Sequence, residues 1–215
     1  YLDEDSVTVD IRNKFKEHIV KMFRLAGVDE VAAQRNMEAV MEIETRIAKA
    51  SFSNVQLRDP ASNYHKMTLD ELRKTIPGIN WDAFLEGVGV KDKIREVSVG
   101  QLEPIREVAE IIHEVPVEKQ IAYLQWNLID GSAKVLSDDF SKENFDFYSR
   151  TMRGTKEMQP RWKRAVNTVS SVLGEAVGEM YVQKYFPAEA KARMVQLVKN
   201  LQTALAERIQ AQAWM

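Results

Sequence analysis

The residue pair best suited to metal chemistry is His113-Glu114, near the middle of the chain. Zinc proteases use His-Glu-x-x-His on one helix, because two imidazoles one turn apart can bind the metal while the glutamate acts as general base. Here the second histidine position holds Val117, and Pro116 would break the helix that aligns the ligands. We therefore interpret His113 as a histidine at a helix end, where its cationic form complements the helix dipole.

The other two histidines are scattered along the chain. His18 borders the apolar face of a first helix, so we expect a packed or half-exposed imidazole. His65 follows Tyr64 in a polar stretch where the sequence clusters no further ligands. The chain contains no cysteine, which excludes thiolate metal sites and a cysteine nucleophile. We assign no catalytic and no metal-binding residue to this chain.

Other chemical motifs also have simpler explanations. The acidic groups Asp3-Glu4-Asp5 and Asp138-Asp139 precede helices, where capping is favoured over acid–base catalysis or calcium binding. Gly87-Val88-Gly89 lacks the third glycine of a nucleotide-binding loop, and Ser170-Ser171 lies inside a helical pattern without a nucleophile elbow. The tryptophans Trp81, Trp126 and Trp162 stand at helical positions among aliphatic residues, which predicts core packing.

Apolar residues recur at helical spacing along most of the chain, which predicts a mainly α-helical fold of seven or more helices. The first two helices, from Ile11 to Ala26 and from Asp29 to Ala48, should form an antiparallel hairpin around Gly27. Further helices are expected at residues 68–76 behind a Thr68–Glu71 capping box, 80–87, 104–114, 116–128, 141–152, 160–185 and 194–209.

Only one segment has the period of a strand. Arg95 to Val99 alternates polar and apolar residues, whereas Ser53 to Lys66 is polar and predicts an ordered loop. A single strand needs a partner, which we expect outside this chain.

Composition excludes several classes of partner. The 30 basic and 32 acidic side chains nearly cancel and are interleaved, so no patch favours nucleic acid. No apolar run reaches the roughly 18 residues that a membrane-spanning helix needs. Because the chain starts at Tyr1 and its last helical pattern has no stop signal, we expect a piece of a longer protein.

Several segments together carry a family resemblance. They are Tyr1-Leu2, Arg58-Asp59-Pro60 with Tyr64 and Met67, the short strand before Gln101, Tyr123-Leu124-Gln125-Trp126, Leu136-Ser137-Asp138, the block from Pro160 through Trp162, Gly178 and Tyr181 to Phe186-Pro187, and Trp214-Met215. In order and spacing they resemble the N-terminal, non-catalytic region of the neprilysin and endothelin-converting-enzyme family of zinc metallopeptidases, especially its bacterial PepO-like branch. Animal members carry a disulfide-forming cysteine where this chain has Ala165, which agrees with a bacterial origin.

The resemblance implies that residues 1–215 are a single helical domain of a larger peptidase whose catalytic zinc domain lies beyond the C-terminus. Such a domain forms a wall of the substrate chamber and restricts access to short peptides. Its partners would be its own catalytic domain and peptide substrates, zinc would be bound only by the parent, and the enzyme would work outside the cytoplasm. The signature residues in the segments above are expected to be structural.

One alternative from another class remains open. The chain could be a self-sufficient helical module that binds a partner helix or peptide in a groove, without an enzymatic role. Its methionine-containing apolar faces would then be adaptable binding surfaces.

Overall fold

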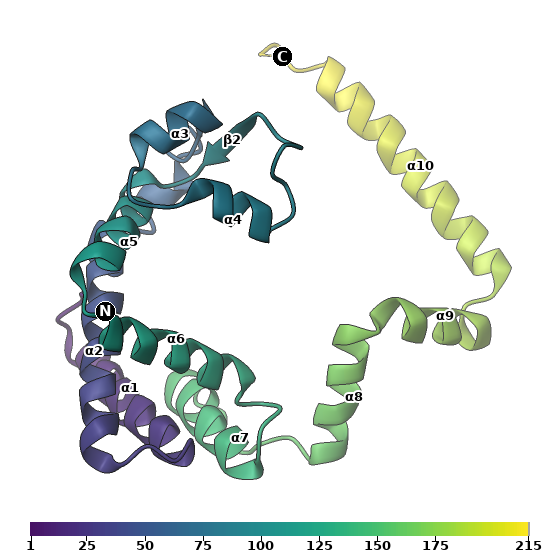
Figure 1. Cartoon of the computed structure of the whole chain (residues 1–215). Helices are drawn as coiled ribbons and strands as arrows, with labels where there is room; N and C mark the ends of the chain where they lie inside the picture. Colours follow the sequence, from purple (N-terminus) through teal and green to yellow (C-terminus); the bar gives the residue numbers. More distant parts are fainter. Residues whose placement is uncertain (215) are drawn as a thin grey trace. The chain divides into compact units, whose positions relative to one another are not determined.

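A computed structural model describes residues 1–214 as a predominantly helical protein (Figure 1). Over these residues the chain forms ten α-helices, one 3₁₀ turn, one π-helix and one two-stranded sheet. The mainly α-helical class and the expectation of seven or more helices are confirmed. Met215, which the family resemblance included, lies outside the described residues. Contacts group the chain into unit 1, Tyr1–Lys156, and unit 2, Glu157–Met215; its organisation as a single domain of a larger enzyme stays a prediction.

Unit 1 is built on the predicted hairpin of α1 (Ser6–Leu25) and α2 (Glu30–Ala50). Asp5 caps α1 by accepting hydrogen bonds from the Val7 and Thr8 amides, and Asp29 caps α2 in the same way. Gly27 takes a positive φ of 89°, which reverses the chain where other residues would be strained. The capping carboxylates and the glycine stop thus act as their positions in the sequence predicted.

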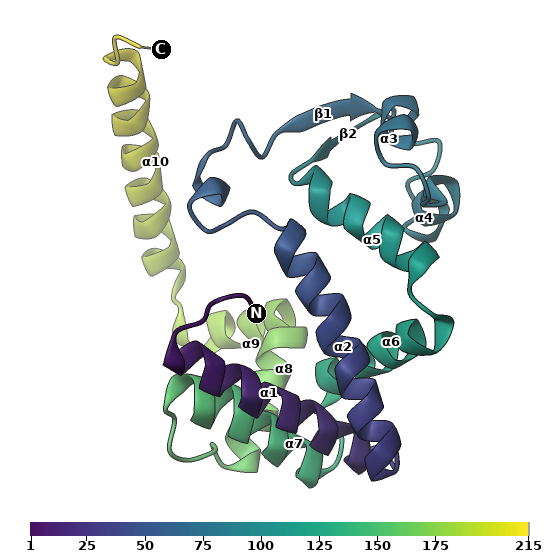
Figure 2. The same cartoon turned by 90° about the vertical axis from the view of Figure 1, so that its left-hand side faces the viewer.

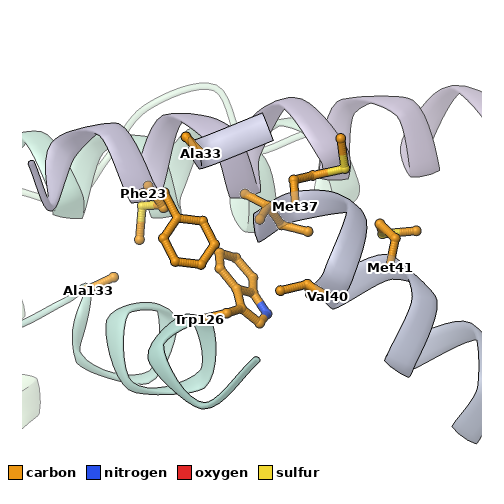
Figure 3. Close-up of a cluster of buried hydrophobic side chains, with 9 residues drawn as sticks. Phe23, Ala33, Met37, Val40, Met41, Trp126 and Ala133 are labelled. Carbon is orange, nitrogen blue, oxygen red and sulfur yellow. The ribbon is translucent and has the colours of Figure 1, made fainter. Parts of the chain in front are cut away.

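Helix α6 (Val117–Ser132) packs against both hairpin helices, and α7 (Asp138–Phe145) with the π-helix η2 (Asp146–Thr151) packs along α1. Figure 3 shows Trp126 of α6 inserted between side chains of the hairpin. Its indole is only 4% exposed, so core packing is confirmed for this tryptophan. The buried residues of this cluster are Ile19, Met22, Phe23, Ala33, Met37, Val40, Met41, Trp126 and Ala133.

A small sheet stands beside the hairpin (Figure 2). Strand β1 (His65–Thr68) pairs antiparallel with β2 (Glu96–Val99), and the strands pack with α3 (Leu69–Thr75), α4 (Trp81–Gly87) and α5 (Leu102–Glu114). The strand expected at residues 95–99 is confirmed, but its partner is β1 and not a segment outside the chain. The strand β1 could not be predicted from the sequence, because β1 is only four residues long and its last residue, Thr68, begins the Thr68–Glu71 capping box, which predicts a helix more strongly.

Arg46 and a second apolar cluster attach this sheet region to the hairpin. The Arg46 guanidinium of α2 donates to Glu107 at 2.5 Å and to Glu114 at 2.9 Å, and both carboxylates belong to α5. Ile43 of α2 packs with Ile111 of α5 in the apolar cluster beside them. Helix α2 therefore supports the sheet region on one side and α6 on another.

Unit 2 contains α8 (Arg161–Val172), α9 (Gly174–Tyr185) and α10 (Ala188–Gln210), with α10 extending away from α9 (Figure 1). The single helix predicted for residues 160–185 is wrong, because the helix breaks at Leu173, whose φ and ψ are −118° and 32°. Gly174 follows at once, and glycine costs about 1 kcal/mol relative to alanine inside a helix. The apolar periodicity continues across the break, which is why the sequence did not reveal it.

The helices of unit 2 form no core of their own within the described residues. None of the described residues of α8, α9 and α10 is buried, and Trp162 is 64% exposed. The large exposed side chains of the first two helices are Trp162, Val166, Val169, Val172, Met180, Tyr181, Val182 and Tyr185. Core packing predicted for Trp162 is therefore wrong for this chain taken by itself.

We predict that Trp126→Ala and Trp162→Ala have very different effects on stability. Trp126→Ala leaves a cavity in the hairpin core and should lower the free energy of unfolding by roughly 3–5 kcal/mol. The matched control Trp162→Ala should change it by less than about 0.5 kcal/mol. Urea unfolding of residues 1–215 followed by far-ultraviolet circular dichroism measures both, and equal losses would contradict the burial described above.

Candidate functional site

The arginine-aspartate-proline segment forms an ordered turn in unit 1. Asp59 follows the 3₁₀ turn η1 (Gln56–Arg58), and its carboxylate accepts a hydrogen bond from the Ala61 amide at 3.0 Å. Hydrogen bonds from the Ser62 hydroxyl and from backbone amides hold the pKa of this carboxyl below its usual range. Asn63 donates from its side chain to the Asp59 carbonyl at 2.7 Å, which closes the turn.

The other signature residues fall into different environments. Met67 packs against the sheet cluster and Trp126 lies in the hairpin core, so the structure does not bring these two together. Tyr64 is largely exposed. In unit 2, Pro160 stands at the N-cap of α8, Phe186 at the C-cap of α9 and Tyr181 on an exposed face. A Cβ added at Gly178 would meet nothing within 4 Å.

The three histidines lie in three separate places. His65 Nδ1 is 3.0 Å from the Val99 carbonyl across the sheet, and His113 Nε2 is 3.1 Å from the Gly78 carbonyl. Helix α5 ends at Glu114 and Pro116 caps α6, so His113 and Val117 belong to different helices, as the sequence predicted. Within residues 1–214, no three histidine, aspartate or glutamate side chains gather in a way that could hold a metal ion.

A polar cluster of unit 1 surrounds the buried His18. The imidazole is 1% exposed. Its Nδ1 lies 3.0 Å from Glu143 Oε1, and its Nε2 lies 3.6 Å from Asp130 Oδ1, within ion-pair range but beyond a hydrogen bond. Lys21, one turn along α1, reaches the second Glu143 oxygen at 3.7 Å. The ring stacks on Phe147 with centroids 4.8 Å apart and meets the edge of Trp126 at 5.7 Å.

Further polar groups complete the site around Asp130. Its second oxygen accepts a hydrogen bond from the Tyr148 hydroxyl at 2.9 Å, while the Asn144 amide lies 3.5 Å from the first. Nearby, the Tyr123 hydroxyl donates to Glu44 at 3.0 Å. Burial, reinforced by these carboxylates, raises the pKa of Tyr123 and Tyr148 above the usual tyrosine range, so both hydroxyls stay protonated and act as donors.

Two opposing effects set the charge of His18. Burial opposes the imidazolium, but attraction to Asp130 and Glu143 outweighs it and raises the pKa of His18 above its ordinary value. Because the ring has almost no exposed surface, it cannot reach a substrate. The arrangement can hold one positive charge between two elements and fix their spacing.

The sequence did not reveal this cluster. The helical pattern predicted only that His18 is a packed or half-exposed imidazole, and the packed form is confirmed. Its partner Glu143 is 125 positions away, and Asp130 lies on a third helix. The only available signal was a histidine on the apolar side of an amphipathic helix, which indicates burial without identifying a partner.

Comparisons with known proteins agree with this fold. The model of the N-terminal region of peptidase family M13 matches residues 1–215. Human membrane metallo-endopeptidase-like 1 is 29% identical over 194 residues, covering 87% of this chain and 25% of that protein. Mouse endothelin-converting enzyme 1 is 30% identical over 195 residues, covering 89% and 25%. The open-state structure of Mycobacterium tuberculosis zinc metalloprotease Zmp1 matches with a TM-score of 0.84 and 31% identity, covering 99% of this chain and 33% of that one.

These matches define the class as the helical N-terminal region of a metallopeptidase. The chain belongs to peptidase family M13, which confirms the resemblance to neprilysin and endothelin-converting enzyme and to their bacterial branch. It spans about a quarter of the length of the curated relatives named above. No helix within residues 1–214 is long and apolar enough to cross a membrane.

We predict that the contact between His113 and the turn at Gly78 makes that glycine more costly to replace than Gly27. Gly78 has a φ of 91°, and an added Cβ would stand 2.9 Å from His113 Nε2. Gly27 has a similar φ of 89° with nothing within 4 Å, so it is a matched control. Gly27→Ala should cost only backbone strain, about 1 kcal/mol, whereas Gly78→Ala should cost roughly 2–3 kcal/mol because His113 must also move. Equal values in urea unfolding would show that His113 does not restrict the turn.

Proposed function

We propose that this chain is the non-catalytic helical part of an M13 zinc metalloendopeptidase and forms a wall of its substrate chamber. The observation that carries the proposal is the match of the whole chain to the N-terminal family model while covering only a quarter of each relative. A wall need not react with peptide. It acts by excluding folded proteins and admitting short chains to the metal, which is selection by steric exclusion.

The residues of this chain do not fit the zinc that the family requires. A catalytic zinc site takes three protein ligands and a water, and the described histidines lie apart with backbone or carboxylate partners of their own. We therefore assign the metal ligands to the remainder of the longer protein. When bound there, zinc would supply a water activated for attack on a peptide bond.

The exposed apolar side chains of unit 2 support docking against that remainder. Isolated soluble proteins rarely leave such continuous apolar faces uncovered. On α10 the exposed apolar residues recur at helical spacing and are Met194, Val195, Leu197, Val198, Leu201, Leu205 and Ile209. In the parent we expect the catalytic domain to cover part of this surface and the peptide substrate to enter beside it. We also propose that the parent enzyme works outside the cytoplasm, which cell fractionation tests directly.

We predict that the full-length protein cleaves peptides and that residues 1–215 alone do not. The full-length parent should cleave a short bradykinin-like peptide and be stopped by a chelator. Residues 1–215 should cleave nothing and retain no stoichiometric zinc after dialysis, because a two-histidine helix and a third ligand are needed to bind and activate the metal. Peptide cleavage assays and metal analysis of the two purified proteins provide the measurement.

Two outcomes would overturn this assignment. One is chelator-sensitive cleavage that follows residues 1–215 through successive columns and disappears on His113→Ala. The other is a parent gene with a stop codon soon after codon 215, without His-Glu-x-x-His downstream.

We also predict that the isolated chain self-associates through unit 2 and that the catalytic half, added in trans, reverses this. Leu201→Glu should weaken self-association at least about tenfold by charging the apolar face of α10, in which Leu201 is 61% exposed. The matched control Gln202→Glu adds a charge at the neighbouring polar position and should have little effect. Analytical ultracentrifugation measures both variants. Self-association unchanged by the catalytic half, together with low-micromolar capture of an unrelated protein, would instead favour an independent interaction module.

A further inference from the structure

The His18 cluster joins elements that are distant in sequence. His18 belongs to α1, Asp130 to α6 and Glu143 to α7, and both carboxylates face the same imidazole from different sides. The π-helix η2 adds two contacts, because Phe147 stacks on the ring and Tyr148 donates to Asp130. Four elements thus meet at one buried side chain.

The protonation state of the ring decides how many of these contacts it can hold. An imidazolium donates from both nitrogens, so it can serve Glu143 and Asp130 together. A neutral imidazole has one N–H, so its other nitrogen would direct a lone pair at a carboxylate. The Nε2 atom makes no hydrogen bond, and its 3.6 Å separation from Asp130 is the weaker of the two contacts. Loss of the proton should therefore release Asp130 first.

The charges around the ring strengthen this dependence. With His18 protonated, its charge opposes both Asp130 and Glu143, and Lys21 adds a second cation at Glu143. With His18 neutral, Lys21 still pairs with Glu143, but it makes no ion pair with Asp130. The titratable and charged groups facing the cluster are Lys21 from α1, Glu44 from α2, Tyr123 and Asp130 from α6, Glu143 from α7, Tyr148 from η2, and Tyr1 from the N-terminal segment. Arg24 and Lys142 line the same surface hollow as Glu143, but among the described residues Lys21 is the only cation besides His18 within ion-pair distance of Glu143.

The cluster holds η2, which lies directly before the segment that connects unit 1 to unit 2. Phe147 and Tyr148 lie in the last helical element of unit 1, and the chain then passes through Gly154 into unit 2. π-Helical turns are uncommon and occur often at functional sites. Whatever holds η2 therefore also holds the start of the connection between the units.

We propose that His18 is a pH-dependent clasp that, when charged, holds α6, α7 and η2 against α1 and, when neutral, loosens η2 and the start of the connection into unit 2. The contacts of Tyr148 and Asn144 with Asp130, and the apolar core of the hairpin, do not use the imidazole proton, so we expect η2 to open locally from α1 while unit 1 stays folded. The clasp belongs to residues 1–156 and can be tested without any peptidase activity.

The direction of the effect follows from linkage. The pKa of His18 is raised in the folded chain above the ordinary value of about 6.5. The stabilisation of the closed form by charged His18 is therefore fully present below pH values near that ordinary pKa. It is lost as the pH rises through the higher pKa of His18 in the folded chain. The opening equilibrium of η2 should rise by up to about tenfold for each unit by which the closed-state pKa exceeds the open-state pKa. The clasp is tight in mildly acidic solution and loosens toward alkaline pH.

The test uses residues 1–215 and two readouts. The imidazole nitrogen signals of His18 are followed by NMR between about pH 5 and about pH 9. At a pH equal to the pKa of an unperturbed histidine, both ring nitrogens of His18 should still be protonated, and the proton should be lost only at higher pH. Hydrogen exchange at residues 146–151, corrected for its intrinsic pH dependence, should accelerate across the same transition. His18→Gln should abolish the acceleration, whereas the matched controls His65→Gln and His113→Gln should preserve it. Asp130→Asn should lower the pKa of His18.

The wild-type titration decides the matter even where a variant does not fold. The proposal would be overturned if His18 were already neutral at a pH equal to the pKa of an unperturbed histidine, that is, if its own pKa lay below that value. It would also be overturned if the hydrogen-exchange rate at residues 146–151 did not change as His18 titrates, or if His18→Gln left the pH dependence of that rate unchanged.

Discussion

Burial of the apolar faces of α1 and α2 against Trp126 is the constraint on which the rest of unit 1 depends. Phe23 and Val40 are fully buried from the two sides of the hairpin, and the indole of α6 closes the space between them. At about 25 cal/mol per Å² of apolar surface removed from water, this cluster is worth far more than any single polar contact around it. The hairpin also presents Arg46 and Ile43 to α5, so the sheet region depends on the same two helices. A hairpin fixed by its core can then hold polar groups such as His18 at defined distances.

The two units show what a helical pattern does and does not determine. In α1 and in α8 the apolar residues recur at the same spacing, yet Ile19 is buried and Val166 is exposed. Periodicity identifies the face that avoids water, and it contains no information about which segment covers that face. This is why the hairpin, the caps at Asp5 and Asp29 and the stop at Gly27 could be predicted, whereas the core expected for unit 2 could not. The missed break at Leu173 has the same origin, since a one-residue change of dihedral angles leaves the spacing nearly intact.

Long-range pairing limited the prediction of the polar site and of the sheet. β1 contributes four residues, and its partner β2 begins 28 positions beyond the end of β1, so local alternation could not establish the register between Met67 and Val97. The same limit applies to His18, whose carboxylate partners follow from the packing of α6 and α7 on α1. By contrast, His113 could be interpreted from its near neighbours alone, because Val117 occupies the second histidine position of the zinc motif and Pro116 cannot continue the helix.

The buried charge at His18 is better explained by geometry than by stability. Removing an imidazolium and two carboxylates from water is costly, and their attraction inside the protein does little more than offset that cost. An apolar side chain in place of His18 alone would pack beside Phe147 and Trp126, but it would leave Glu143 and Asp130 without their cation and would specify no position for either carboxylate. The imidazole instead specifies where Glu143 and Asp130 must lie, and through Tyr148 it specifies where η2 must lie. In a protein whose apolar core already secures the hairpin, the polar cluster adds directional contacts to η2, the last helical element of unit 1, beside the packing of Phe147 on Phe15.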